Sequence, residues 1–139
     1  MGVIPSDFIL PADDERDIWY VNRMLVLLRP RQPFVDWLNS TLDPDETPQT
    51  LAEIEGSPGA FLIPIFEYRE EAEEWIRENY ILIFETHLWD WIDRPEQWPA
   101  DRTWQLFVEW FDVELLGAPW DVVAAPLHSN PPPREDGWN

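Results

Sequence analysis

The chain combines a strong excess of acidic side chains with an abundance of aromatic ones, and together these features restrict what it can fold into. It contains 28 Asp and Glu residues against 9 basic residues, a formal net charge of −19, yet 45% of its residues are hydrophobic and ten are tryptophan. Acidic chains that stay disordered have few aromatic residues, because they cannot bury enough apolar surface to offset the entropy lost on folding. We therefore expect a folded domain with its charge on the outside.

An acidic surface also restricts the partners that the domain can bind. It repels nucleic acid and anionic membranes, and it attracts basic proteins. The most basic stretch, Tyr20–Leu42, contains only three arginines, which is too few for a DNA-binding surface in so acidic a chain. The composition thus predicts a basic protein partner, no direct contact with nucleic acid and no membrane contact, and it is compatible with a homo-oligomer.

Length and residue usage narrow the class of protein further. At 139 residues we expect one domain with a single core. The chain has no cysteine, which excludes disulfides, thiol catalysis and cysteine-based zinc sites. The N-terminal residues lack the basic start and apolar run of a secretory signal, and the longest apolar stretches, Met24–Leu28 and Tyr80–Phe84, are too short to span a bilayer. A cytoplasmic protein is the expectation.

Changes in amino-acid composition along the chain predict the domain limits. Residues 1–19 are acidic and contain prolines, as expected of a leader, and residues 124–139 form a proline-rich tail that we expect to be flexible. Residues 20–123 are the expected α+β domain.

Three segments within this domain have residue patterns that are typical of strands. Tyr20–Arg29 alternates, with Met24, Val26 and Leu28 on one face, and Pro30 ends it. Ala60–Phe66 is short and apolar, and its Pro64 predicts a position near a sheet edge. The third expected strand is Asp112–Val123. We expect the three to pair in one mostly antiparallel sheet.

About four helices are expected around this sheet, in the order β-α-β-α-α-α-β. The first begins near Pro33 and carries Phe34, Trp37 and Leu38 on one face. A long helical tract follows the second strand, and Asn79 could mark a break in it. The last helix is capped by Asp101 or Thr103, with Trp104, Phe107, Val108 and Phe111 facing inward.

Residues that could carry catalysis are few, and we predict no catalytic, cofactor-binding or metal-binding residue. His87 lies on the apolar stripe of the long helical tract, which is typical of a structural histidine, and His128 lies in the tail. Five acids crowd the start of the same tract: Glu70, Glu71, Glu73, Glu74 and Glu78. A solvated face is the preferred interpretation, with Arg77 pairing with Glu73, and divalent-ion binding or acid–base catalysis remains the alternative.

The tryptophans divide into two groups. Those on helical stripes are expected in the core: Trp37, Trp75, Trp91 and Trp104. The others, Trp89, Trp98, Trp110 and Trp120, are harder to place, and Trp110 is expected to point away from the face of Trp104. Tryptophans beside acids are typical of a protein-binding hot spot or of a second aromatic core, and the second interpretation is favoured. The candidate partner-binding residues are Trp89, Trp98, Trp110, Glu70, Glu73 and Glu74.

The central part of the chain, about residues 21–122, resembles a family of small acidic bacterial proteins of uncharacterised activity. The resemblance rests on the strand before Arg29-Pro30, the helix Pro33-Phe34-x-x-Trp37-Leu38, the acidic helix, and Trp98-Pro99 before Glu109-Trp110-Phe111-Asp112. Some members carry the label of VacJ-type lipoproteins, which does not suit a chain without a lipobox cysteine. Ile81 and Leu82 are apolar where relatives would be polar, which indicates extra burial or an interface.

These observations favour a non-enzymatic acidic domain that binds a basic protein, in the manner of an immunity protein, an antitoxin or an inhibitor. One alternative is a DNA mimic that inhibits a nucleic-acid-binding protein. Another is a carboxylate-based enzyme or a metal-dependent protein that uses Glu67–Glu78 or the surroundings of His87. A concave pocket with converging acids would favour the enzyme, and an acidic face with exposed tryptophan would favour the binding protein.

Overall fold

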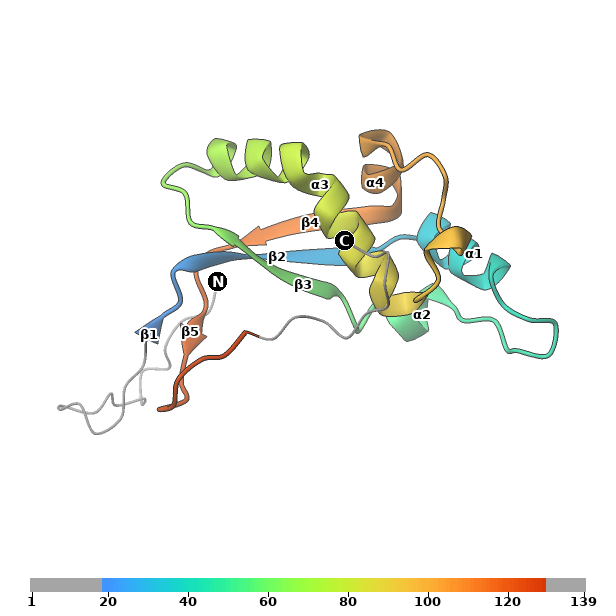
Figure 1. Ribbon diagram of the computed structural model, residues 1–139, viewed down its shortest axis with the longest axis horizontal. Coiled ribbons are helices and arrows are strands. Elements are labelled where there is room, and N and C mark those ends of the chain that lie inside the picture. The colour runs from blue at the N-terminus through green and yellow to red at the C-terminus, as the bar shows by residue number, and fades with distance from the viewer. Residues whose placement is uncertain (1–18, 130–139) are drawn as a thin grey trace.

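The computed structural model describes residues 19–129, in which helices cover one face of a three-stranded sheet (Figure 1). This is the predicted α+β class. The elements follow in the order β1 (Trp19–Tyr20), β2 (Arg23–Pro30), α1 (Gln32–Ser40), α2 (Leu51–Ile54), β3 (Gly59–Pro64), α3 (Arg69–Trp91), a 3-10 turn η1 (Pro95–Gln97), α4 (Trp104–Trp110), β4 (Phe111–Leu116) and β5 (Trp120–Asp121).

The sheet is antiparallel throughout, with the strand order β3-β2-β4. The predicted alternation of β2 is confirmed, because Val26 and Leu28 are buried under the helices while Arg23 and Arg29 are exposed. Pro64 lies on β3, an edge strand, as its missing N–H requires.

The third strand is shorter than predicted. We expected one strand over Asp112–Val123, but β4 ends at Leu116, and the chain then passes through Gly117 and Pro119. Trp120–Asp121 forms a separate two-stranded sheet with Trp19–Tyr20. Because glycine and proline weaken strand pairing, Gly117 and Pro119 interrupt the expected strand and separate β4 from β5.

Helices α1, α3 and α4 form where capping and periodicity predicted them, whereas the four-residue helix α2 between α1 and β3 was not expected. Pro33 lies in the first turn of α1, and the Thr103 hydroxyl accepts a hydrogen bond from the Leu106 N–H at the start of α4. The long tract is one helix, α3, with the expected break as a kink: Asn79 has φ −118° and ψ 15°. Its side-chain amide donates to the Trp75 carbonyl at 2.9 Å, so it competes with the helical hydrogen-bond ladder.

The core is a layer of aromatic rings between the sheet and the helices. Phe34 of α1, Phe84 of α3, Phe107 of α4 and Phe111 of β4 are the largest fully buried side chains. Phe34 and Phe111 have ring centroids 5.0 Å apart. One aromatic cluster therefore joins all three long helices to the sheet.

The ends of the chain lie largely outside the described residues. Of the expected leader, 1–19, only Trp19 is described, and it belongs to β1. Of the expected tail, 124–139, the described part is residues 124–129, which are exposed and contain no helix or strand.

We predict that Gly59→Ala destabilises the domain, because Gly59 lies against the face of His87. A Cβ at this position would lie 2.5 Å from the His87 Nδ1 atom and 2.8 Å from Cε1. The ring is packed on its other sides, so we expect a loss of about 1–3 kcal/mol in the free energy of unfolding, measured by denaturant titration.

Gly56→Ala is the matched control, since nothing lies within 4 Å of a Cβ there. Equal effects of the two substitutions on stability would contradict the steric explanation.

Candidate functional site

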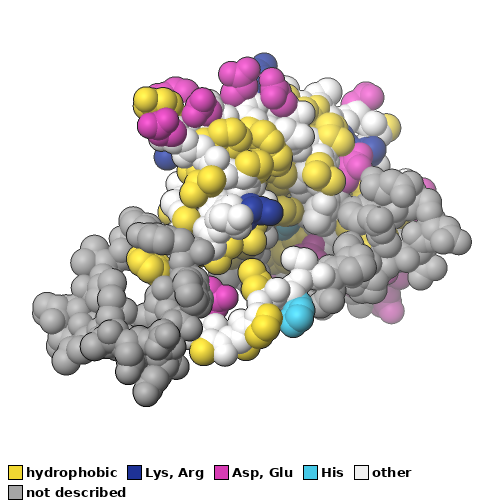
Figure 2. All heavy atoms as spheres, turned by 60° about the vertical axis from the view of Figure 1, so that its left-hand side comes forward, with side chains coloured by type: hydrophobic (Ala, Val, Ile, Leu, Met, Phe, Trp, Pro, Cys, Tyr) yellow, Lys and Arg dark blue, Asp and Glu magenta, His cyan; other side chains and the backbone are white. Residues whose placement is uncertain are grey.

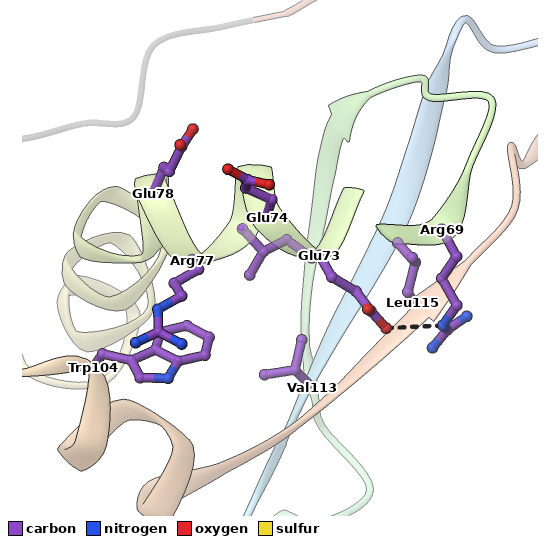
Figure 3. A pocket seen from close by; sticks show the side chains of 9 residues that line it. Arg69, Glu73, Glu74, Arg77, Glu78, Trp104, Val113 and Leu115 are labelled. Carbon is purple, nitrogen blue, oxygen red and sulfur yellow. Dashed lines mark hydrogen bonds and ion pairs between the residues drawn. The ribbon is translucent and has the colours of Figure 1, made fainter. Parts of the chain in front are cut away.

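A groove lies between the first half of α3 and the strand β4 (Figure 3). Its volume is about 810 Å³ and it is open to solvent. Side chains from α3, α4 and β4 line it: Arg69, Glu73, Glu74, Ile76, Arg77, Glu78, Trp104, Val113 and Leu115.

The floor of the groove is apolar because the core continues to the edge of the sheet there. Val113 and Leu115 lie on the face of β4 that is turned toward the helices, and Ile76 of α3 is 3% exposed. Trp104, in the first turn of α4, closes one end (Figure 3). The sheet has no strand beyond β4 among residues 19–129, so this apolar surface stays accessible from the side.

Charged side chains of α3 form the rim. The Arg69 guanidinium and the Glu73 carboxylate form an ion pair of 3.0 Å, and the Arg77 guanidinium lies 5.2 Å from the centroid of the Trp104 ring. The expected pair between Glu73 and Arg77 is therefore not formed. Arg77 reaches the aromatic ring instead, which offers it a cation–π contact.

The remaining carboxylates on the rim point outward. Glu74 and Glu78 extend away from the groove (Figure 3), and neither forms an ion pair within the described residues. In a view from the side on which α3 begins, acidic side chains line the top of the molecule above hydrophobic surface (Figure 2). The rim thus carries net negative charge beside an apolar floor.

The structure brings together only some of the predicted partner-binding residues. Glu73 and Glu74 line the groove, and Glu70 is exposed on the preceding turn of α3. Trp98 and Trp110 are each only 7% exposed, so they lie in the core and not at a surface where a partner could dock.

Each buried tryptophan has a specific structural role. The Trp98 indole N–H donates to the Ile92 carbonyl at 2.8 Å, which ties the loop after α3 to the end of that helix. Trp110 packs on Trp37 with ring centroids 5.3 Å apart. The sequence placed Trp110 off the inner face of α4 because Trp104 was taken to lie on that face. The buried residues of α4 are instead Phe107 and Trp110, which are three positions apart and so share one face of the helix.

Other residues named from the sequence lie away from the groove lining. Trp89 is half-buried and packs against the core from α3, and Trp120 of β5 is 42% exposed. Ile81 and Leu82 are both exposed on α3, so the alternative of extra burial does not apply to them.

His87 is a buried structural residue, as predicted. It is 3% exposed and lies among aromatic rings, the nearest being Phe111 at 5.0 Å between centroids. Burial lowers the pKa of its imidazole from 6.5 to about 4, because the charged form loses its hydration. The ring is neutral at pH 7 and does not line the groove.

The described residues also bear on two other kinds of site. Within 19–129, no group of three or more His, Asp or Glu side chains is placed to hold a metal ion. No helix in the same part of the chain is long and apolar enough to cross a membrane.

The residues that sequence analysis missed are those that form the apolar floor. Trp104 was assigned to the core on its spacing from Phe107, and Val113 and Leu115 were treated only as part of a strand. The available signal was the lack of a further strand-like segment to cover the outer edge of β4. Using it would have required knowing the strand order.

Comparison with known proteins gives no match: no family model, no curated protein and no solved structure is similar to this chain.

We predict that His87 makes the stability of the domain depend on pH between about 6.5 and 4. Its pKa is lower in the folded state, so the unfolded chain takes up the proton first as the pH falls. The free energy of unfolding of the wild type should fall by about 2 kcal/mol between pH 7 and pH 5 relative to a His87→Gln variant. Above pH 6.5 the difference between the two should be constant.

The comparison with His87→Gln cancels the contribution of the many carboxylates, which both proteins share. Denaturant titrations at half-unit pH steps measure it. A constant difference from pH 7 to pH 5 would show that the imidazole is hydrated in the folded protein.

Proposed function

We propose that this chain is a non-enzymatic binding domain that holds a basic protein partner in the groove between α3 and β4. The observation that carries the proposal is the combination of an apolar floor, formed by Ile76, Val113, Leu115 and Trp104, with the glutamates of the rim. Apolar and aromatic contacts determine how long such a complex lasts, and the surrounding charge determines how fast it forms.

The electrostatics of the whole chain support a basic partner over an acidic or neutral one. The net charge is −19, and the first half of α3 contributes five glutamates against two arginines. One arginine is paired with Glu73 and the other lies over Trp104. The outward carboxylates of Glu74 and Glu78 therefore dominate the field that an approaching molecule meets.

The same geometry favours binding over carboxylate catalysis. General acid–base catalysis needs carboxylates that converge on a reacting atom. Glu74 and Glu78 diverge into solvent, and Glu73 is held by Arg69 (Figure 3). A DNA mimic is supported less well, because it would need rows of carboxylates and gains nothing from an apolar recess beside them.

We predict that Glu74→Gln/Glu78→Gln slows association with the partner, identified by affinity capture, and flattens its dependence on salt. Long-range attraction acts on the encounter step and is screened within about 8 Å at physiological ionic strength. Stopped-flow association rates between 20 and 300 mM salt measure the effect. The matched control is Asp45→Asn/Glu55→Gln, which removes the same charge from exposed residues outside the groove lining.

In the same complex, Trp104→Ala should act mainly on dissociation, with a loss of about 2 kcal/mol of binding free energy. Circular dichroism and thermal melting of the free variant separate this effect from unfolding. If both charge variants slow association equally, the acidic rim of the groove is not the region that guides the partner.

A further inference from the structure

The outer edge of β4 is a strand edge that lies open in the groove between α3 and β4. Within residues 19–129, β4 pairs only with β2. An unpaired edge presents a row of N–H and C=O groups that can pair with another chain, and natural proteins blunt such edges with proline, inward charge or bulges. The sequence of β4, Phe-Asp-Val-Glu-Leu-Leu, contains neither proline nor glycine.

The phase of the ladder shows which backbone groups face outward. The Arg31 N–H donates to the Trp110 carbonyl at 2.8 Å. In an antiparallel pair the bonded residues alternate along each strand. With β2 and β4 in one continuous register from this pair onward, the N–H and C=O groups of Val113 and Leu115 point away from β2. These are the residues whose side chains form the groove floor.

The opposite edge of the sheet is blunted at one position. The same phase turns the backbone groups of Ala60, Leu62 and Pro64 on β3 outward. Pro64 has no N–H to offer there, as is usual for edge strands that must stay unpaired. Ala60 and Leu62 keep their N–H groups, so the edge of β3 is interrupted at one position, whereas the outward residues of β4 all keep their donors.

We propose that the basic partner binds by adding an extended segment to the free edge of β4 as a fourth strand. This inference rests on the proposed function and specifies the partner: a strand whose apolar and basic side chains alternate. Main-chain hydrogen bonds provide the attachment, and side chains on the two faces provide the selectivity.

The two faces of the sheet determine that alternation. On the groove side the segment would meet Ile76, Trp104 and the guanidinium of Arg77, which suits apolar side chains and disfavours basic ones. On the opposite face it would lie beside Asp112 and Glu114. These two acids are ion-paired with Arg31 and with Arg29 of β2, respectively, and their side chains are still 65% and 42% exposed. Oppositely charged side chains stabilise adjacent strands, so basic residues fit there.

A second copy of this chain fits the edge less well than a basic segment. Two antiparallel β4 strands would bring Asp112 and Glu114 of one copy beside the same acids of the other, and like charges directly across a strand pair are destabilising. The net charge of −19 on each copy adds to this repulsion.

The test uses an eight-residue peptide of alternating valine and arginine, capped at both ends, and the full-length protein. One derivative carries N-methyl groups on the valines and another on the arginines. Only one set of N–H groups faces β4 in an added strand: that of the valines if the peptide runs antiparallel, and that of the arginines if it runs parallel. We expect one derivative to bind at least about tenfold more weakly and the other to bind like the parent, by calorimetry.

Hydrogen exchange gives an independent readout at single residues. In the free protein the amides of Val113 and Leu115 should exchange faster than those of Asp112 and Glu114, and the parent peptide should slow them. The weakly binding derivative should not.

Several results would overturn strand addition. They are equal binding of both derivatives, equal binding of a peptide with four valines followed by four arginines, no binding of the parent peptide at millimolar concentration, or unchanged exchange at Val113 and Leu115. A partner that still responds to Glu74→Gln/Glu78→Gln would then show that the acidic groove binds it by another geometry, which leaves the proposed function standing without the fourth strand.

Discussion

The fold depends on the contact between one aromatic layer and one face of a three-stranded sheet. Phe111 is central to it, because it begins β4 directly after α4 and contacts Phe34 and His87, each at 5.0 Å between ring centroids. Within residues 19–129 only one face of this sheet carries helices, so the interior there has a single layer of side chains with which to exclude water. Large planar rings bury the most apolar surface for each residue position. This arrangement explains how ten tryptophans and a net charge of −19 can occur in one folded chain. The rings fill a thin core, and the acids occupy the surface that so small a domain must expose.

Patterns of two and of 3.6 residues predicted most of this fold. The alternation of β2, the edge position of Pro64, the cap at Thr103 and the break at Asn79 each follow from one local rule. The burial of individual tryptophans did not follow, since it depends on where elements meet. Trp110 ends α4 and packs beneath α1, and Trp98 lies in a loop without periodicity that folds back onto the end of α3. For the same reason the candidate groove could be anticipated only in part: the glutamates of α3 were visible in the sequence, whereas the apolar floor required the strand order.

The glutamates of α3 form one acidic cluster in the sequence, but their surroundings differ in the folded protein. Glu73 pairs with Arg69, four residues before it, although Arg77, four residues after it, offers the more favourable order of charges for a helical pair. Arg77 instead lies over Trp104, where its aliphatic stem can also cover apolar surface. Cation and ring together close one end of the groove, and the carboxylates of Glu74 and Glu78, which form no ion pair with any residue of 19–129, face solvent (Figure 3). The negative charge that would attract a basic partner therefore lies on the outer side of the helix, and the apolar surface that would contact it lies beneath.

The asymmetry between the two edges of the sheet follows from the same one-sided packing. Arg29 pairs with Glu114 at 2.7 Å and Arg31 lies 3.7 Å from Asp112, so cross-strand ion pairs hold the uncovered face of β4 to the central strand. Those pairs are exposed and contribute little stability individually, but they fix which face of β4 is turned toward α3. With that orientation fixed, the outward backbone groups of Val113 and Leu115 and their apolar side chains belong to one continuous surface. A strand edge can pair with another chain when its donors are free, and an apolar groove can bind a partner when its floor is accessible. At β4 both conditions hold at the same two residues, whereas at β3 Pro64 removes one of the three outward donors.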